Sequence, residues 1–214
     1  MILLLLIAPT VLIYAGLYVF QNVPITFLLF YGWLFLMPVL FKTNVLRNLT
    51  DKTRIRHILV GIGLGTFCLV GIIVSGALLH NELFDSSQLG LLLKKWEFTG
   101  EYTIGLVFIL TLVNPLLEEI YWRGFILEKL HSMKYKVLIS SFFYSLYHFL
   151  VLLPMFKGPY PLIFFLLVFF AGIVWGWMVI KFRTLWGSII CHALADTGII
   201  VIYFSYLPTF ISNF

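Results

Sequence analysis

Ionisable side chains occur inside some of the most apolar stretches of this 214-residue sequence. A charged side chain at the centre of a lipid bilayer costs at least about 2.5 kcal/mol, so such residues are rare there and usually functional. Three separate apolar stretches carry them. The residues are Glu118, Glu119, Arg123, His148, His192 and Asp196. We interpret them as a candidate active site.

The residue types favour hydrolysis by an activated water molecule. His192 and Asp196 are four positions apart, so on a helix they project from one face. Glu118 and Glu119 are about 100° apart on a helix, so we expect only one of them to point fully into the site. The i,i+4 spacing pairs Glu119 with Arg123 and leaves Glu118 to act as general base. A carboxylate base, two imidazoles and a further carboxylate suit water activation and offer no obvious covalent nucleophile.

The depth of these residues supports a shared site. Glu118, His148, His192 and Asp196 lie nine to thirteen residues from the basic residue that bounds each apolar stretch. At 1.5 Å rise per residue, all four lie roughly 14 to 20 Å from the same membrane boundary. Independent structural polar residues have no reason to share one depth, whereas the members of one site do.

A proline precedes the first acidic pair. Pro115 lies three residues before Glu118, and a proline inside a helix removes a hydrogen bond and kinks the axis. Such breaks are tolerated in membranes where the backbone borders protein or water. We expect a kink here, with either a packing role or a water-accessible cavity beside Glu118.

The composition indicates an integral membrane protein. Hydrophobic residues make up 62% of the chain and charged residues 11%, with mean hydropathy +1.05, whereas soluble domains are about half apolar and a quarter charged. The apolar runs match the roughly 20 residues that cross about 30 Å of hydrocarbon. We predict an all-α polytopic transmembrane bundle of about seven helices, forming a single integral membrane domain over residues 1–214 with its motif-bearing core at about 103–207. The predicted helices cover residues 2–20, 24–41, 57–79, 103–127, 136–156, 161–181 and 185–207.

Short features of the sequence refine this prediction. Residues 1–20 lack a basic leading region and a small-residue cleavage site, so we expect a first transmembrane helix rather than a removed signal peptide. Residues 89–96 could form a short amphipathic helix at the interface. Cys68 and Cys191 are expected to be small buried residues without a disulfide. Gly61 and Gly65 are four apart in an apolar run, a spacing that favours close helix packing over a nucleotide-binding loop.

Lysine and arginine placement predicts the topology. Ten basic residues fall in segments 42–56, 129–136 and 181–183, and three fall in the alternate connections. Because cytoplasmic loops carry the excess of Lys and Arg, we predict a cytoplasmic N-terminus and a C-terminus on the opposite side of a cell membrane. The net charge of +5 is accounted for in this way, and we expect the lipid bilayer but no nucleic acid as a partner.

Three linked motifs resemble those of the CPBP family, which comprises type II CAAX prenyl endopeptidases and the related bacteriocin-processing or immunity (Abi) proteins. Residues 118–123 read EEIYWR and match E-E-x-x-x-R, followed by the typical Gly124-Phe125. Residues 144–148 read YSLYH, with Tyr144 in place of Phe in F-x-x-x-H. Residues 192–196 read HALAD and match H-x-x-x-N/D. The resemblance covers about 118–196, while the first three predicted helices carry no motif.

The resemblance implies proteolysis, within the bilayer, of a membrane-embedded peptide or a lipidated protein C-terminus. By motif position, Glu118 and His148 would activate water, and Glu119 and Arg123 would support the site. His192 with Asp196 would bind a metal or stabilise the oxyanion. A divalent ion such as Zn, with His148, His192 and Asp196 as its ligands, is therefore an expected cofactor. In an oxyanion hole an asparagine would donate a hydrogen bond, whereas an ionised Asp196 would repel the developing negative charge.

Two other functions fit parts of the sequence. A non-catalytic bacteriocin-immunity or membrane-scaffold protein of the same fold could keep the motifs for stability. An ion transporter could use mid-membrane carboxylates and histidines, but transporters often have two similar halves, whereas the polar residues here lie in the second half only. The short loops resemble a bacterial member, so we expect the bacterial plasma membrane. We favour the protease.

Overall fold

The computed structural model describes residues 1–43, 55–98 and 100–206, and the described residues form helices and short connections without any strand. Six helices are long and apolar enough to cross a membrane, and a seventh apolar helix has 17 residues. The predicted all-α polytopic bundle is therefore confirmed. The seven are α1 (Ile2–Tyr14) with its π-helical continuation η1 (Ala15–Phe20), α2 (Val23–Leu40), α4 (Ile55–Leu83), the composite helix Thr103–Lys129, α9 (Lys136–Leu152), α10 (Tyr160–Phe182) and α11 (Trp186–Tyr206).

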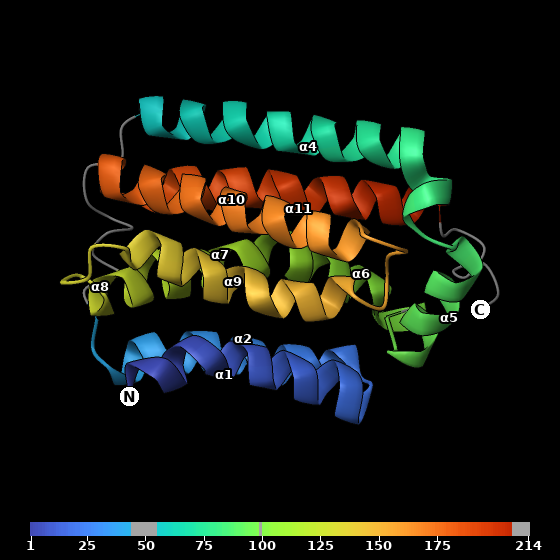
Figure 1. Ribbon diagram of the computed structural model, residues 1–214, viewed down its shortest axis with the longest axis horizontal. Coiled ribbons are helices and arrows are strands. Elements are labelled where there is room, and N and C mark those ends of the chain that lie inside the picture. Colours follow the sequence, from blue (N-terminus) through green and yellow to red (C-terminus); the bar gives the residue numbers. More distant parts are fainter. Residues whose placement is uncertain (44–54, 99, 207–214) are drawn as a thin grey trace.

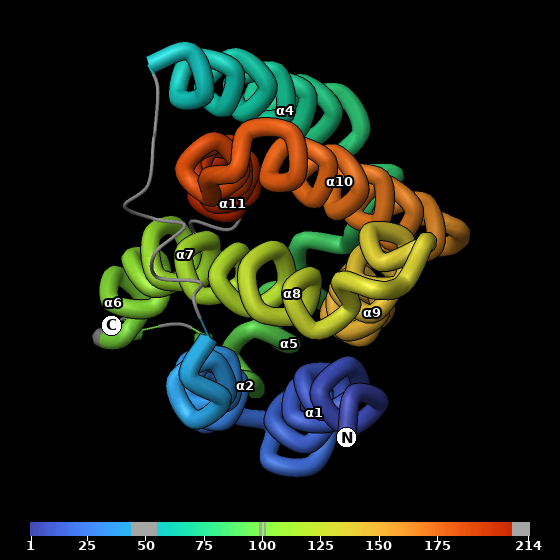
Figure 2. Tube along the Cα trace, turned by 90° about the vertical axis from the view of Figure 1, so that its left-hand side faces the viewer, coloured from blue at the N-terminus to red at the C-terminus, as the bar shows by residue number. Residues whose placement is uncertain are grey.

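The helices stack in four layers (Figures 1 and 2). α4 forms one outer layer and packs on α11, which lies beside α10. The composite helix and α9 form the next layer, and α1 with α2 forms the opposite outer layer. The chemistry-bearing helices therefore occupy the two inner layers, where apolar packing surrounds them on both sides.

Close packing of α4 on α11 depends on glycine. A Cβ added at Gly65 would lie 2.9 Å from the Cα of Cys191, and one added at Gly61 would collide with the backbone of Gly187. Small residues allow two membrane helices to approach to backbone contact. The prediction that Gly61 and Gly65 serve packing is confirmed.

The composite helix contains two π-helical segments between its α-helical parts. It runs as α6 (Thr103–Phe108), the π-helical η3 (Ile109–Val113), α7 (Asn114–Glu118), the π-helical η4 (Glu119–Ile126) and α8 (Leu127–Lys129). Pro115 has no N–H to donate to the preceding turn, and the helix is widened over the five residues that end just before Asn114. The expected break near Pro115 is thus a π-helical turn, a form that recurs at functional sites.

Two helices differ from the prediction at their ends. The fifth helix was expected to reach residue 156 but ends at Leu152, because Pro154 cannot donate the next helical hydrogen bond. The third runs from Ile55 to Leu83, longer than the predicted 57–79. A short helix α5 (Ser86–Lys95), capped by Asp85, contains most of the segment predicted to be amphipathic.

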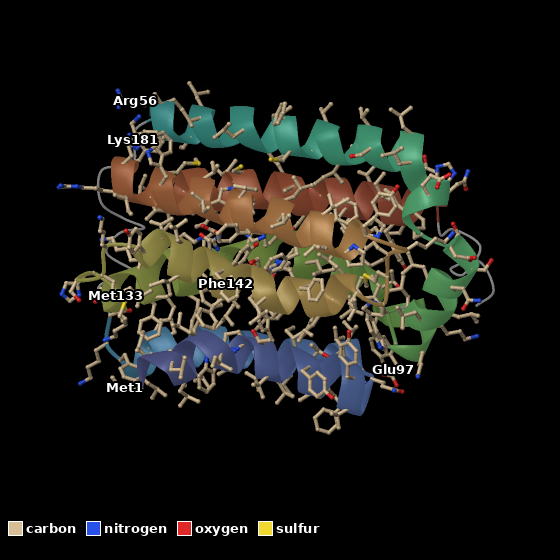
Figure 3. The ribbon with its side chains drawn as sticks, viewed as in Figure 1. Met1, Arg56, Glu97, Met133, Phe142 and Lys181 are labelled. Carbon is tan, nitrogen blue, oxygen red and sulfur yellow. The ribbon has the colours of Figure 1, made fainter. Side chains whose placement is uncertain are left out.

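The basic segments that the structure describes gather at one end of the bundle. Figure 3 shows Arg56, Lys181 and Met133 at the same end as Met1, with Glu97 at the opposite end. Arg47, Lys52 and Arg54, which contribute to the predicted charge asymmetry, lie outside the described residues. This arrangement fits the predicted topology, and the assignment of that end to the cytoplasm stays a prediction.

Candidate active site

Six predicted site residues come from three helices of the two inner layers. Glu118 ends α7, Glu119 begins η4 and Arg123 follows one turn later; His148 lies on α9. His192 and Asp196 lie on α11. Glu118, Glu119, Arg123 and His192 are each at most 3% exposed, the Asp196 side chain is 16% exposed, and His148 is half-buried. The structure brings His192 and Asp196 together with both glutamates.

A buried ion pair anchors the first motif. Arg123 Nη1 lies 3.1 Å from Glu119 Oε1, which confirms the predicted i,i+4 pairing. The guanidinium carbon also lies 4.0 Å from the ring centre of Tyr144 and 5.2 Å from that of Trp175. Cations over aromatic faces gain most where water is excluded. Arg123 thus neutralises Glu119 and joins η4 to the helices that face it.

His192 lies between the two glutamates. Its Nδ1 is 3.3 Å from Glu119 Oε1, and its Nε2 is 3.7 Å from Glu118 Oε2 and 3.5 Å from Asp196 Oδ2. The expectation that only one glutamate could reach the site is wrong, because the ring presents its two nitrogens to opposite sides and so meets both carboxylates. Trp175 stacks on this ring at 4.3 Å and 20°. Stacking therefore fixes the plane of the imidazole, and three carboxylates lie within 3.7 Å of its nitrogens.

His148 presents one nitrogen without a proton. Its Nδ1 lies 2.9 Å from the backbone carbonyl of Tyr144. A carbonyl only accepts, so Nδ1 carries the hydrogen and Nε2 keeps its lone pair. The rings of Tyr144 and Tyr147 flank the imidazole at 4.6 and 4.5 Å. The Tyr144 hydroxyl does not orient His148 but lies 3.4 Å from Nε2 of His192, so Tyr144 serves His148 through its backbone and ring.

Glu118 retains an unused acceptor. Among the residues that the structure describes, neither Glu118 Oε2 nor the Tyr147 hydroxyl makes a hydrogen bond of full geometry, although the two groups are near enough to interact. A buried carboxylate oxygen without a donor is costly unless water or a substrate group supplies one. This free position is where a general base would take a proton from water.

Asp196 has a partner that the sequence did not reveal. Asn114 Nδ2 donates to Asp196 Oδ2 at 3.0 Å, and the Tyr31 hydroxyl donates to Asn114 Oδ1 at 3.1 Å. Asn114 could have been suspected as a polar residue next to Pro115 in an apolar run. Tyr31 had no such signal, because it lies on α2 in a segment without any motif. Asp196 accepts a hydrogen bond while facing His192, which favours an orienting role over an oxyanion donor.

The cysteines take structural positions. Both are free, and Cys191 is buried as predicted, whereas Cys68 is only half-buried. Trp175 Nε1 donates to Cys191 Sγ at 3.1 Å, so this thiol holds the indole that stacks on His192.

His148, His192 and Asp196 are the residues expected to bind a metal ion. Within the part of the chain that the structure describes, no three His, Cys, Asp or Glu side chains are grouped as metal ligands. His148, His192 and Asp196 are therefore not arranged as a zinc site, and of the two glutamates beside His192, Glu119 is already paired with Arg123. The residues as placed do not fit a zinc ion, and whether the protein binds zinc is a question for elemental analysis.

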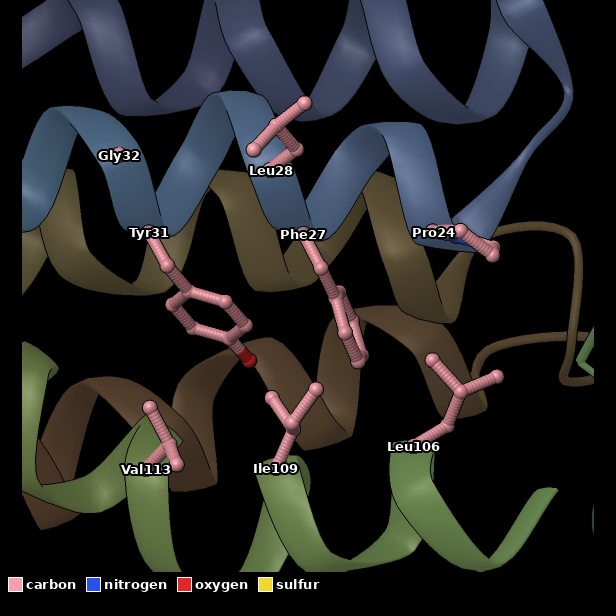
Figure 4. Close-up of a pocket in the computed structure, with 8 residues that line it drawn as sticks. All are labelled: Pro24, Phe27, Leu28, Tyr31, Gly32, Leu106, Ile109 and Val113. Carbon is pink, nitrogen blue, oxygen red and sulfur yellow. The ribbon is translucent and has the colours of Figure 1, made fainter. Parts of the chain in front are cut away.

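An apolar groove approaches the site from the lipid-facing side. It has a volume of about 410 Å³ and lies between α2 and the start of the composite helix. Figure 4 shows the Tyr31 side chain crossing from α2 toward η3, with its hydroxyl foremost. Glu118 is not part of the lining and is 2% exposed, so this groove is not the water-accessible cavity that was one of the two expectations for the break at Pro115. The lining residues are Pro24, Phe27, Leu28, Tyr31, Gly32, Leu106, Ile109 and Val113.

Comparison with known proteins agrees with the motifs. Residues 100–198 match the family model for type II CAAX prenyl endopeptidase Rce1-like proteins. Searches of curated proteins and of solved structures find no match. The matched segment spans just under half of the chain and contains all six predicted site residues. Over residues 100–198 this protein is therefore similar to the Rce1-like family of type II CAAX prenyl endopeptidases.

Proposed function

We propose that this multi-pass membrane protein is an intramembrane endopeptidase that hydrolyses a peptide bond near the C-terminus of a lipidated protein or membrane-embedded peptide. The observation that carries the proposal is the buried Glu118 carboxylate, with one oxygen lacking a donor and lying 3.7 Å from His192 Nε2. General acid–base groups need this kind of free position beside a second polar group. The bacterial plasma membrane and a cytoplasmic N-terminus are part of the proposal.

The proposed reaction uses one water molecule. Glu118 accepts a proton from the water while Nε2 of His148 holds it by accepting its second hydrogen. The hydroxide oxygen attacks the scissile carbonyl, and the negative charge on the tetrahedral intermediate is stabilised by the O–H donor of Tyr144 and by the positive charge of a His192 held between its carboxylates. Glu118 then passes its proton to the leaving amine nitrogen as the C–N bond breaks. The products are one carboxylic acid, which passes its proton to the amine or to solvent, and one amine, and no protein atom is consumed.

The supporting groups hold this arrangement. Glu119, neutralised by Arg123 at 3.1 Å, faces His192 Nδ1, and Asp196 faces His192 Nε2. Acceptors on both sides favour an imidazole that carries its hydrogens toward the carboxylates and has its plane set by Trp175. Preorganised donors in a site without bulk water stabilise developing charge more strongly than donors in water.

The test compares Glu118→Gln with Glu128→Gln in proteoliposomes, using fluorogenic peptides with a farnesylated Cys-aliphatic-aliphatic-X end and identical peptides without the lipid. Glutamine keeps the size of the side chain but is not a base. Removing a general base costs about 10²- to 10⁴-fold, so Glu118→Gln should lower kcat/KM by at least about 100-fold. Glu128 is exposed on the same composite helix and serves as the matched control. Wild-type cleavage by a folded Glu118→Gln variant would refute the proposal.

One observation favours the second candidate, a non-catalytic immunity or scaffold protein. Glu118 is 2% exposed, as expected of a residue kept for stability. In that case no peptide of the panel would be cleaved, and Glu118→Gln would change the thermal stability of the protein alone. Cleavage that depends on Glu118 excludes this candidate.

A further inference from the structure

A chain of hydrogen bonds connects the N-terminal helices to the site. It runs from the Tyr31 hydroxyl on α2 to Asn114 Oδ1, at 3.1 Å, and from Asn114 Nδ2 to Asp196 Oδ2, at 3.0 Å. Asp196 Oδ2 is in turn 3.5 Å from His192 Nε2. Tyr31 lies outside the matched segment 100–198, so this connection joins a helix without any motif to the third motif.

The Tyr31 hydroxyl and the Asp196 carboxylate together hold the Asn114 amide in one orientation. An amide side chain offers an acceptor at one end and donors at the other. With the hydroxyl donating to Oδ1, the donor end must face Asp196. Turned around, Oδ1 would oppose the Asp196 carboxylate, and two acceptors would meet in a buried place. Asn114 is 7% exposed, so bulk water offers little compensation for the wrong orientation.

The orientation of Asn114 determines where Asp196 rests. Asn114 Nδ2 donates to Asp196 Oδ2, the same oxygen that faces His192 Nε2. Without that donor, the Asp196 side chain could turn toward the 16% of its surface that is exposed. His192 would then lose one of the acceptors that set the direction of its Nε2–H.

We propose that Tyr31 is a positioning residue of this site, which acts through Asn114 to hold Asp196 against His192. The inference rests on the proposed function and adds to it a residue that touches none of the reacting atoms. Because Tyr31 also lines the apolar groove (Figure 4), its ring faces the side from which the groove opens.

The first measurement is a comparison of two tyrosine variants on the farnesylated fluorogenic peptide. Tyr31→Phe removes only the hydroxyl and should lower kcat roughly tenfold, the size of one hydrogen bond's net contribution, with KM within about twofold. Tyr18→Phe is the matched control, because the Tyr18 hydroxyl donates to the Leu150 carbonyl at 2.7 Å and joins the N-terminal helices to α9 without reaching Asp196. Its kcat should stay within about twofold of wild type.

The second measurement exchanges the two side chains that Tyr31 is proposed to align. Asn114→Asp alone sets two carboxylates against each other and should lower kcat by about 100-fold. The double variant Asn114→Asp/Asp196→Asn restores a donor–acceptor pair, with the carboxylate at position 114 still accepting from Tyr31. Its kcat should return to within about tenfold of wild type, whereas a role in packing alone would give no such rescue.

The outcomes separate this inference from the proposed function. Equal kcat for Tyr31→Phe and Tyr18→Phe, with Glu118→Gln inactive, would overturn the positioning role and leave the protease intact. A kcat loss for Tyr31→Phe that matches its unfolded fraction, measured by thermal unfolding, would also overturn it. Full activity of Glu118→Gln would overturn the proposed function itself, and this inference with it.

Discussion

Replacing Arg123 by methionine should destabilise the protein more than almost any other single change at the site. The substitution keeps much of the side-chain volume but removes the guanidinium that lies 3.1 Å from Glu119 Oε1. Glu119 is 0% exposed, so its charge would be left buried without its cation. Breaking a buried pair in this way costs about 3–5 kcal/mol. For a chain of this size about 1 kcal/mol corresponds to a Tm shift of roughly 2–4 °C, which gives a fall of about 6–20 °C.

The loss should be reversible by a second substitution. In Glu119→Gln/Arg123→Met neither charge remains, and neutral replacement of both partners is often close to neutral in stability. Most of the Tm should return, while kcat stays low because glutamine stabilises a charged His192 less well than a carboxylate does. The assay is thermal unfolding in detergent, followed by intrinsic fluorescence.

An exposed cation over an aromatic ring supplies the control for Arg123. Lys181 Nζ lies 4.4 Å from the ring centre of the exposed Trp177, so Lys181→Met should shift Tm by at most about 3 °C. An Arg123→Met protein that unfolds within about 3 °C of wild type would show that the ion pair does not carry the stability assigned to it.

Two further predictions concern packing and metal. Gly65→Leu should lower Tm, by roughly 2–12 °C for an overpacking cost of about 1–3 kcal/mol, because a Cβ there would lie 2.9 Å from the α11 backbone. Gly63→Leu, where a Cβ would meet nothing within 4 Å, should change it little; equal shifts would contradict the close packing. Zinc measured by elemental analysis should be far below one ion per chain both in active wild-type protein and in His148→Ala/His192→Ala. One zinc per active chain, lost in the double variant, would support the metal centre instead.

Much of this fold could be predicted because lipid limits the choices available to the chain. All seven helices follow from apolar runs of suitable length, and the errors lie at their ends, where Pro154 stops one helix early. The Glu119–Arg123 pair and the meeting of His192 with Asp196 follow from i,i+4 spacing, which is local and therefore readable from the sequence.

The remaining features of the site depend on contacts between helices. No spacing rule indicates that Tyr31 would reach Asn114, 83 residues away, or that the Tyr144 hydroxyl would face His192 rather than His148. The reach of both glutamates to one imidazole depends on how α11 lies against the composite helix. Such geometry is set by the packing of whole layers and not by the periodicity of any one helix.

The position of Tyr31 also bears on how this protein could have diverged from its relatives. The family model matches residues 100–198 and leaves α2 outside the matched segment. If the hydroxyl of Tyr31 contributes to activity, the part of the chain needed for full activity is larger than the segment that matches the family model. A chimera that joins residues 100–198 to the first helices of a protein of that family should therefore insert and fold, yet work slowly until a hydroxyl is restored opposite Asn114.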